Sequence, residues 1–399
     1  MKILFVNFNI GGFAGDSGQI PLIAKYLLKL GHHVTIVTTD GDIFFYDKKK
    51  SIQYSKIRQK LQNAHEKIIE INDIPVLPVH CITEKIGLYC PNASKIAKEI
   101  LPKYDVVHIH NWYYHLGMTF AKIASEINFP FIVSANGSLQ EKAHSLKSRQ
   151  KWLADKLYTN KLIPKASILQ SVGKLETEQY VKFGSVSEKI VRIDHGIDLN
   201  NFCIKEKTGI IEKFKINEPY LLFLSRIDKK KGLEILIESF KKIQTKTENL
   251  SLVIAGTGDE KYVKNIKTIV KNLDLDSYIK FTGYVTEQEK LELLKFSKFY
   301  VLTSHSDVHP IAVQDALAMG TPVLITKECD YPEISTYEAG LEISPTVDSI
   351  TNGISTMLSD DVKLQNYSKN AKKLIKEKFL LESKISEYER MYEKAIANN

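Results

Sequence analysis

Short apolar segments alternate with amphipathic helical segments along almost the whole chain, and this alternation restricts the fold more than any other feature. The short segments are apolar at consecutive positions, which is typical of strands in a parallel sheet that helices cover on both faces. One helical segment carries Leu233, Leu236 and Phe240 at the i, i+3, i+7 spacing of a buried helix face. The pattern therefore predicts two Rossmann-like α/β domains. The predicted strands span Ile3–Val6, Val34–Thr38, Val106–Ile109, Phe131–Ser134, Ile168–Ser171, Ile190–Ile193, Tyr220–Leu224, Leu252–Ala255, Tyr278–Phe281, Phe299–Leu302 and Val323–Ile325.

The predicted boundary between the domains lies in residues 195–218, which lose the strand period and gain charge. We expect an N-terminal domain over residues 1–197, a linker over 198–217 and a C-terminal domain over 218–378. A chain of 399 residues is long enough for two such hydrophobic cores. The charged helical tail is interrupted near Phe379–Leu381, so we expect residues 379–399 to return to the N-terminal domain as a helix.

Composition and charge exclude several classes of protein. The 55 Lys and Arg against 47 Asp and Glu leave a formal charge of +8, which favours anionic partners but is too small for a dedicated nucleic-acid binder. No run approaches the ~18 apolar residues of a membrane-spanning helix, and the first residues lack the pattern of a signal peptide. The four cysteines form no Cys-x-x-Cys pair, so we expect neither a disulfide framework nor structural zinc. A soluble cytoplasmic protein is the expectation.

A turn between a predicted strand and a predicted helix carries two cations that could act together. Arg226 and Lys231 lie between the strand that ends at Leu224 and the helix that follows Gly232. Ligands bind at the carboxyl edge of open α/β sheets, where a helix N-terminus also favours anions. Two cations and backbone amides at this edge would hold a diphosphate. The alternative is a solvated basic turn, because Lys229–Lys231 is a plain run of charge.

A second strand-to-helix turn carries two carboxylates. Asp307 lies eight residues before Asp315, which falls in the opening turns of a short predicted helix that ends before Gly320 and Pro322. The start of this helix presents free amides to a phosphate, and the Asp315 carboxylate can accept hydrogen bonds from both hydroxyls of a ribose. The alternative is that Asp315 only complements the helix dipole, an effect under about 1 kcal/mol.

Together the two turns resemble the nucleotide-sugar glycosyltransferases of the GT-B fold, in particular glycosyltransferase family four (glycosyl transferases group 1). The pattern of that family is Arg-x4-Lys-Gly, followed by Glu-x7-Glu and Ala-x-Ala-x-Gly-x-Pro-Val. The chain has Arg226-x4-Lys231-Gly232 and then Asp307-x7-Asp315, which runs into the same stretch up to Val323. The resemblance covers nearly the whole chain. It implies an α/β, GT-B fold with two Rossmann-like domains facing across a deep interdomain cleft.

The resemblance implies a retaining glycosyltransferase. Such an enzyme moves a sugar from a UDP- or GDP-sugar to a glycan, glycolipid or lipid-linked acceptor in surface polysaccharide or glycoconjugate biosynthesis. Arg226 and Lys231 would bind the diphosphate, so that no cofactor and no obligatory metal is implied. Asp307 would contact the transferred sugar and Asp315 the ribose. The remaining residues implied as catalytic are His110 and Asn136, and those implied as donor-binding are Gly12, Gly15, Gly256, Gly283, Tyr284, His309, Ile311 and Ala312.

The chain departs from the family pattern at several of these positions. Both acidic positions are Asp where the family usually has Glu, and Pro310 has no amide to donate to a phosphate. Asn136 stands where many members have His, and it cannot carry a charge. Either Gly12 or Gly15 could face the donor phosphate. These departures keep open a non-catalytic homologue acting as a partner or scaffold. Two other enzymes of the GT-B fold are also alternatives: a synthase with a sugar-phosphate acceptor and a nucleotide-sugar epimerase.

Histidines and basic stretches suggest two further hypotheses. His108 and His110 share one face of a strand and, with His115, suggest a metal site. No carboxylate or cysteine completes a metal-ligand spacing, so we expect no metal there. Trp112 would either stack on a sugar or belong to the core. The helical, basic stretches 48–67 and 142–165 would either face solvent or lie on an anionic membrane, where each nearby cation contributes roughly 1 kcal/mol.

Overall fold

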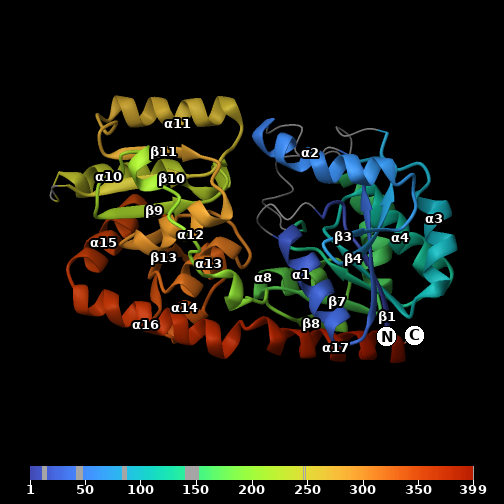
Figure 1. The fold of residues 1–399 in the computed structure, drawn as a ribbon. Coiled ribbons are helices and arrows are strands. Elements are labelled where there is room, and N and C mark those ends of the chain that lie inside the picture. The colour runs from blue at the N-terminus through green and yellow to red at the C-terminus, as the bar shows by residue number, and fades with distance from the viewer. Residues whose placement is uncertain are drawn as a thin grey trace. The chain divides into compact units, whose positions relative to one another are not determined.

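The computed structural model describes residues 1–10, 16–41, 48–82, 88–139, 152–245, 247 and 249–398. By its internal contacts the chain divides into two compact units, one formed by Met1–Gly196 with Leu381–Asn399 and the other by Ile197–Leu380. Each unit is built on one sheet of mostly parallel strands with helices packed on it (Figure 1). The α/β class predicted from the strand and helix alternation is therefore confirmed.

The first unit contains an eight-stranded sheet in the order β3-β4-β2-β1-β5-β6-β7-β8. All neighbouring strands pair in parallel except β3 and β4, which form an antiparallel hairpin at one edge. The strands are β1 (Lys2–Val6), β2 (His33–Thr39), β3 (Ile69–Ile71), β4 (Ile74–Val79), β5 (Val106–His110), β6 (Phe131–Ser134), β7 (Ile168–Ser171) and β8 (Ile190–Arg192). The helices include α1 (Asp16–Lys29), α2 (Lys48–Asn63), α3 (Ala93–Ile100), α4 (His115–Glu126), α7 (Asn160–Leu162), α8 (Lys174–Lys182) and α17 (Leu381–Ala397).

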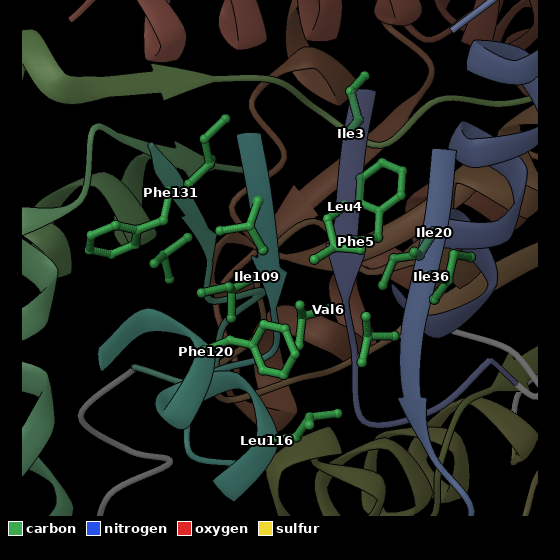
Figure 2. Close-up of a cluster of buried hydrophobic side chains, with 14 of the residues drawn as sticks. Ile3, Leu4, Phe5, Val6, Ile20, Ile36, Ile109, Leu116, Phe120 and Phe131 are labelled. Atoms are coloured by element: carbon green, nitrogen blue, oxygen red, sulfur yellow. The ribbon is translucent and has the colours of Figure 1, made fainter. Parts of the chain in front are cut away.

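The core of the first unit lies on both faces of its central strands. Figure 2 shows Phe5 of β1 beside Ile20 of α1, and Phe120 of α4 against Ile109 of β5. These side chains are at most 1% exposed. Burial on both faces explains why β1 is apolar at every position after Lys2.

The C-terminal helix α17, red in Figure 1, packs against α1, β5 and β7. Its Tyr392 hydroxyl lies 3.1 Å from Nδ1 of His108, and Nε2 of His108 lies 2.5 Å from the Ser134 hydroxyl. Ser134 donates in turn to Gln170, whose amide donates to the Ile193 carbonyl at 2.8 Å. This buried polar chain joins the last helix to three neighbouring strands of the first unit.

The second unit contains a six-stranded parallel sheet in the order β11-β10-β9-β12-β13-β14. Its strands are β9 (Tyr220–Leu224), β10 (Ser251–Ala255), β11 (Ile279–Gly283), β12 (Phe299–Leu302), β13 (Val323–Thr326) and β14 (Gly340–Ile343). Its helices are α9 (Ile210–Lys213), α10 (Leu233–Gln244), α11 (Glu260–Asn272), α12 (Glu287–Phe296), α13 (Ile311–Met319), α14 (Glu333–Thr336), α15 (Val347–Leu358) and α16 (Asp361–Lys378). The apolar face of α10 is buried as its spacing predicts, with Leu233, Leu236 and Phe240 fully covered.

The chain passes between the two units twice, and the two passages are neighbours. The Ile197 amide donates to the Phe379 carbonyl at 2.7 Å, and Ile197 forms a parallel bridge with Leu380. A Cβ on Gly196 would lie 2.9 Å from the Leu381 Cα, so the two segments could not approach so closely with a larger residue there. Within the described part of the chain, no helix combines the length and the apolar character that a membrane crossing requires.

Candidate functional site

The strand order of the second sheet places two loops next to each other. The sheet starts at β9 and extends through β10 and β11 on one side and through β12, β13 and β14 on the other, so the order reverses between β9 and β12. The loops that follow these two strands leave the carboxyl edge at this reversal point. In open α/β sheets such a point is where ligands bind. The two turns singled out in the sequence, 225–232 and 303–310, are these loops.

Glycines allow the loops around this point to approach one another at the backbone. Gly232 has φ +62°, and a Cβ there would lie 2.1 Å from the Thr303 carbonyl oxygen. Gly256 has φ +140°, and its Cβ would lie 1.9 Å from the Ser225 carbonyl oxygen. The Gly256 amide donates to the Gly283 carbonyl at 2.8 Å. Gly256 and Gly283, both predicted to bind a donor, thus also hold the ends of β9, β10 and β11 together.

The closest pair of charges at the reversal point is Lys231 and Asp307. The Lys231 ammonium donates a hydrogen bond to Oδ2 of Asp307, and both side chains are largely buried. The backbone fixes this pair, since the Lys230 carbonyl accepts from the His305 amide at 2.7 Å and from the Ser304 hydroxyl at 2.9 Å. The sequence predicted that Lys231 and Asp307 serve one site, and the structure brings them into contact.

Further cations surround this pair. Arg226 is exposed on the loop after β9, and Lys230 is half-buried. Burial is the main cause that lowers the pKa of the Lys230 ammonium, and the Lys231 and Arg226 charges lower it further against the opposing effect of Asp307. Three cations therefore act on one another here, and an arriving anion would relieve their repulsion. Lys230 was not predicted, because nothing in the run Lys229–Lys231 distinguishes it from its neighbours.

Helix α13 begins beside these loops and directs its N-terminus to the carboxyl edge of the sheet. Ile311 and Ala312 are its first residues, and Pro310 in the N-cap position provides no side-chain cap. Amides of a first helical turn have no partner within their own helix, and they attract anions. The predicted donor-binding roles of Ile311 and Ala312 thus rest on their backbone.

His309 occupies a different environment from that of the neighbouring loop residues. Its side chain is buried and stacks on the Tyr331 ring at 3.8 Å between centroids. The Phe379 ring meets it edge-on, and Nε2 lies 3.8 Å from a Glu333 oxygen. The structure therefore places the imidazole of this predicted donor-binding residue in the core of the second unit. Tyr284, another predicted donor-binding residue, lies directly after β11 and is half-buried.

Asp315 lies in the second turn of α13 and is paired with a lysine that sequence reasoning missed. Lys290 of α12 donates to Oδ2 of Asp315 at 2.8 Å and lies 2.7 Å from a Glu287 oxygen. Burial raises the pKa of the Asp315 carboxyl, and the charge and hydrogen bond of Lys290 oppose this rise. The two positions are 25 residues apart in the sequence, and no motif connects them.

In the first unit, His110 ends strand β5 and is buried. Its ring lies 3.9 Å from that of His108 and 5.4 Å from that of Phe5, between centroids. Burial, with a smaller effect of His195, lowers the pKa of His110 to about 3. Its Nε2 has no hydrogen-bond partner among the described residues. At this pKa the imidazole is neutral at physiological pH.

Asn136 lies in a tight turn after β6, with φ +50°. The turn is fixed by the buried Glu176, whose carboxylate accepts from the Gly137 amide at 2.7 Å and from the Val172 amide at 2.9 Å. Trp112 is a core residue, since it is 1% exposed and donates to the Thr159 hydroxyl at 2.9 Å.

The first sheet has its own reversal point between β1 and β5. Asn111, after β5, donates to Asn7, after β1, at 3.0 Å. Gly12 and Gly15, which the resemblance places in this region, lie outside the described residues.

The metal hypothesis for His108, His110 and His115 finds no support, because the described residues contain no group of three or more metal-ligating side chains suited to an ion.

Comparison with known proteins identifies two matching families. The family described as Glycosyl transferases group 1 matches residues 205–374, and the family described as Glycosyltransferase Family 4 matches residues 22–201. An uncharacterized glycosyltransferase of Methanocaldococcus jannaschii is 24% identical, and the match covers 99% of both chains. The alpha-monoglucosyldiacylglycerol synthase of Streptococcus pneumoniae is 23% identical over 80% of this chain and 70% of its own.

Solved structures of GT-B glycosyltransferases share the fold. Anabaena HepE in complex with UDP and glucose superposes with a TM-score of 0.74 at 17% identity, covering 98% of this chain and 99% of HepE. WaaG, a glycosyltransferase involved in lipopolysaccharide biosynthesis, gives a TM-score of 0.68 at 17% identity, covering 99% of this chain and 98% of WaaG. The likeness extends over both units of the chain.

Proposed function

This chain belongs to the family-four glycosyltransferases of group 1, and we propose that it transfers a sugar from a nucleotide-diphosphate sugar to an acceptor. The transfer retains the configuration at the anomeric carbon, and the acceptor is a glycan, a glycolipid or a lipid-linked molecule. The observation that carries the proposal is the contact between Lys231 and Asp307 at the reversal point of the second sheet, with Arg226 and Lys230 around it. These groups match the two halves of a glycosyl donor, since the cations suit its diphosphate and the carboxylate suits the hydroxyls of its sugar.

The relatives narrow the class of donor and product in this proposal. HepE was solved with UDP and with UDP-glucose, which favours UDP-sugars ahead of GDP-sugars. The pneumococcal relative is named for a glycolipid product, and WaaG for lipopolysaccharide. A lipid-linked or surface glycan acceptor is therefore the proposed second substrate.

In the proposed reaction the diphosphate leaves the anomeric carbon as the acceptor hydroxyl attacks the same face. Arg226 and Lys231 stabilise the negative charge that grows on the leaving diphosphate, and the amides of Ile311 and Ala312 add to this. A donor phosphate oxygen takes the proton of the acceptor hydroxyl, so the step needs no carboxylate base. Because the cations of the chain neutralise the diphosphate, the proposal includes no obligatory metal. Asp307 orients the transferred sugar through its hydroxyls.

Release of nucleoside diphosphate from UDP-, GDP- and ADP-sugars, with and without candidate acceptors, tests the proposal. We expect one donor to be turned over in the presence of EDTA, with the α or β configuration preserved in the product by NMR. Lys231→Ala should reduce the rate ~10²–10³-fold. The matched control is Lys229→Ala, which removes an exposed cation two residues away and should retain most of the rate. Equal loss in both variants, or no turnover and no nucleotide binding across the panel, would contradict the proposal.

Peripheral binding to an anionic membrane is the proposed route to a lipid-linked acceptor. In the second of the basic stretches, residues 142–151 lie outside the described part, but the part that follows is described. There Trp152, Leu153 and Leu157 are 62%, 50% and 50% exposed, and the Lys156 ammonium lies 5.5 Å from the Trp152 ring centroid. Exposed apolar groups beside a cation suit the interface of an anionic bilayer.

A further inference from the structure

Lys290 and Asp315 form a largely buried ion pair in which the ammonium also contacts a second carboxylate. Both side chains are largely buried, at 14% and 9% exposure. One ammonium serves two carboxylates, because Lys290 contacts Asp315 at 2.8 Å and Glu287 at 2.7 Å. A buried ion pair of this kind contributes little to stability compared with well-packed apolar residues.

Each of the two charged groups shifts the pKa of the other. Burial alone would lower the pKa of Lys290, but the Asp315 and Glu287 carboxylates together raise it, so the ammonium keeps its proton. Burial raises the pKa of Asp315, and Lys290 is the group that opposes this, while Glu287 adds to the rise. Without Lys290, a carboxyl in this environment would take up a proton far more readily.

Other titratable groups near Asp315 cannot replace Lys290. The other group of α12 that shifts the pKa of Asp315 is Glu287, which has the wrong sign. Strand β12 contributes Tyr300, which is buried and whose pKa is raised well above its usual range, chiefly by burial, so it remains neutral. From α16, Lys372 lies against Gly320 at the other end of α13.

We propose that Lys290 is a positioning residue for the donor nucleotide, which acts by holding Asp315 as a carboxylate so that it accepts hydrogen bonds from the ribose hydroxyls. This inference rests on the proposed function, in which Asp315 meets the ribose. An ionised carboxylate accepts from two neighbouring hydroxyls, whereas a protonated one must place its own O–H in the same space. Lys290 therefore strengthens binding of the ribose but does not affect binding of the diphosphate.

Calorimetric titration of UDP and of inorganic pyrophosphate between pH 5.5 and 8.5 tests this role. Lys290→Met should weaken UDP binding progressively towards acid pH, about tenfold for each pH unit below the new carboxyl pKa, while pyrophosphate binding stays within about twofold of that of the unchanged protein. Lys290→Arg should restore the original pH profile. Protonation of the diphosphate itself affects all variants alike and cancels in the comparison.

Two further proteins complete the design. Lys213→Met is the matched control, since the exposed Lys213 side chain lies 3.7 Å from Glu289 in the first turn of α12. This variant should leave both titrations unchanged. Glu287→Gln removes the competing carboxylate and should extend UDP binding to lower pH than in the unchanged protein. This variant also decides the matter if Lys290→Met does not fold.

The possible outcomes separate this inference from the proposed function. The role of Lys290 would be overturned if UDP binding had parallel pH profiles in the unchanged protein and in Lys290→Met, or if Lys290→Met lost equal affinity for UDP and for pyrophosphate. In either case, UDP binding by the unchanged protein would still support a nucleotide donor. A shift to higher pH in Glu287→Gln would also overturn it. Absence of binding by any nucleoside diphosphate to the unchanged protein would overturn both.

Discussion

Acidification should destabilise the first unit through His110, and the structure sets the size of the effect. The pKa of His110 is lowered from 6.5 to about 3, mainly by burial. The unfolded chain therefore binds a proton at this position below pH 6.5, whereas the folded protein does not. Stability is present in full above pH 6.5 and falls as the pH decreases towards 3, at about 1.4 kcal/mol per pH unit. At pH 5 the loss amounts to roughly 2 kcal/mol.

The substitution His110→Phe isolates this contribution. Phenylalanine does not titrate, and it can pack beside Phe5 and His108, whose rings surround the position. Any fixed packing cost is independent of pH. The difference in unfolding free energy between variant and unchanged protein should therefore shift by roughly 2 kcal/mol in favour of the variant between pH 8 and pH 5.

Urea unfolding followed by tryptophan fluorescence provides the measurement. Both tryptophans of the chain, Trp112 and Trp152, belong to the first unit, so the signal reports on that unit. His108 remains in both proteins, and because burial is the main cause that lowers its pKa, ahead of the charge of His110, most of its contribution cancels in the difference. A difference that stays constant from pH 8 to pH 5 would refute the reasoning, because it would show that the folded protein binds the proton as readily as the unfolded chain.

Two further predictions concern backbone packing and the membrane. Gly256→Ala places a Cβ against the Ser225 carbonyl oxygen at positive φ and should lower the unfolding free energy by at least about 2 kcal/mol. Gly18→Ala, in a helix with open space around it, should leave the unfolding free energy unchanged or raise it by up to about 1 kcal/mol. Thermal unfolding of both variants measures this difference, and equal midpoints would contradict it. Trp152→Ser should reduce severalfold the fraction of protein that floats with vesicles containing anionic phosphatidylglycerol. An unchanged fraction would show that the exposed Trp152 side chain does not contribute to membrane binding.

The elements around the candidate site were predictable because their signals are local. The predicted strands Tyr220–Leu224 and Phe299–Leu302 match β9 and β12 residue for residue. Strand ends fix the position of Lys231 and Asp307 along the sequence, and parallel pairing then brings the two loops to one edge. The hairpin of β3 and β4 was missed because β4 contains Pro75 and Pro78, which argue against a strand in the interior of a sheet.

Tertiary contacts explain the parts of the site that sequence reasoning could not reach. Lys290 meets Asp315 only because α12 packs against α13, and its position in the sequence marks it as an ordinary surface lysine. The resemblance implied that His309 binds the donor, but it did not reveal that the His309 ring stacks on Tyr331, a residue that follows a different strand. Side-chain direction within a loop has no period that a sequence reveals.

The return of α17 to the first unit has a consequence for the order in which the protein is made. Residues 197–380 form a continuous unit, whose synthesis is complete before that of α17 begins. The first unit, in contrast, lacks Tyr388, Tyr392 and the rest of α17 until this helix has been synthesised. Domains usually fold in the order of synthesis, the N-terminal one first. In this chain the core of the unit that is synthesised first cannot be completed until α17 has been added.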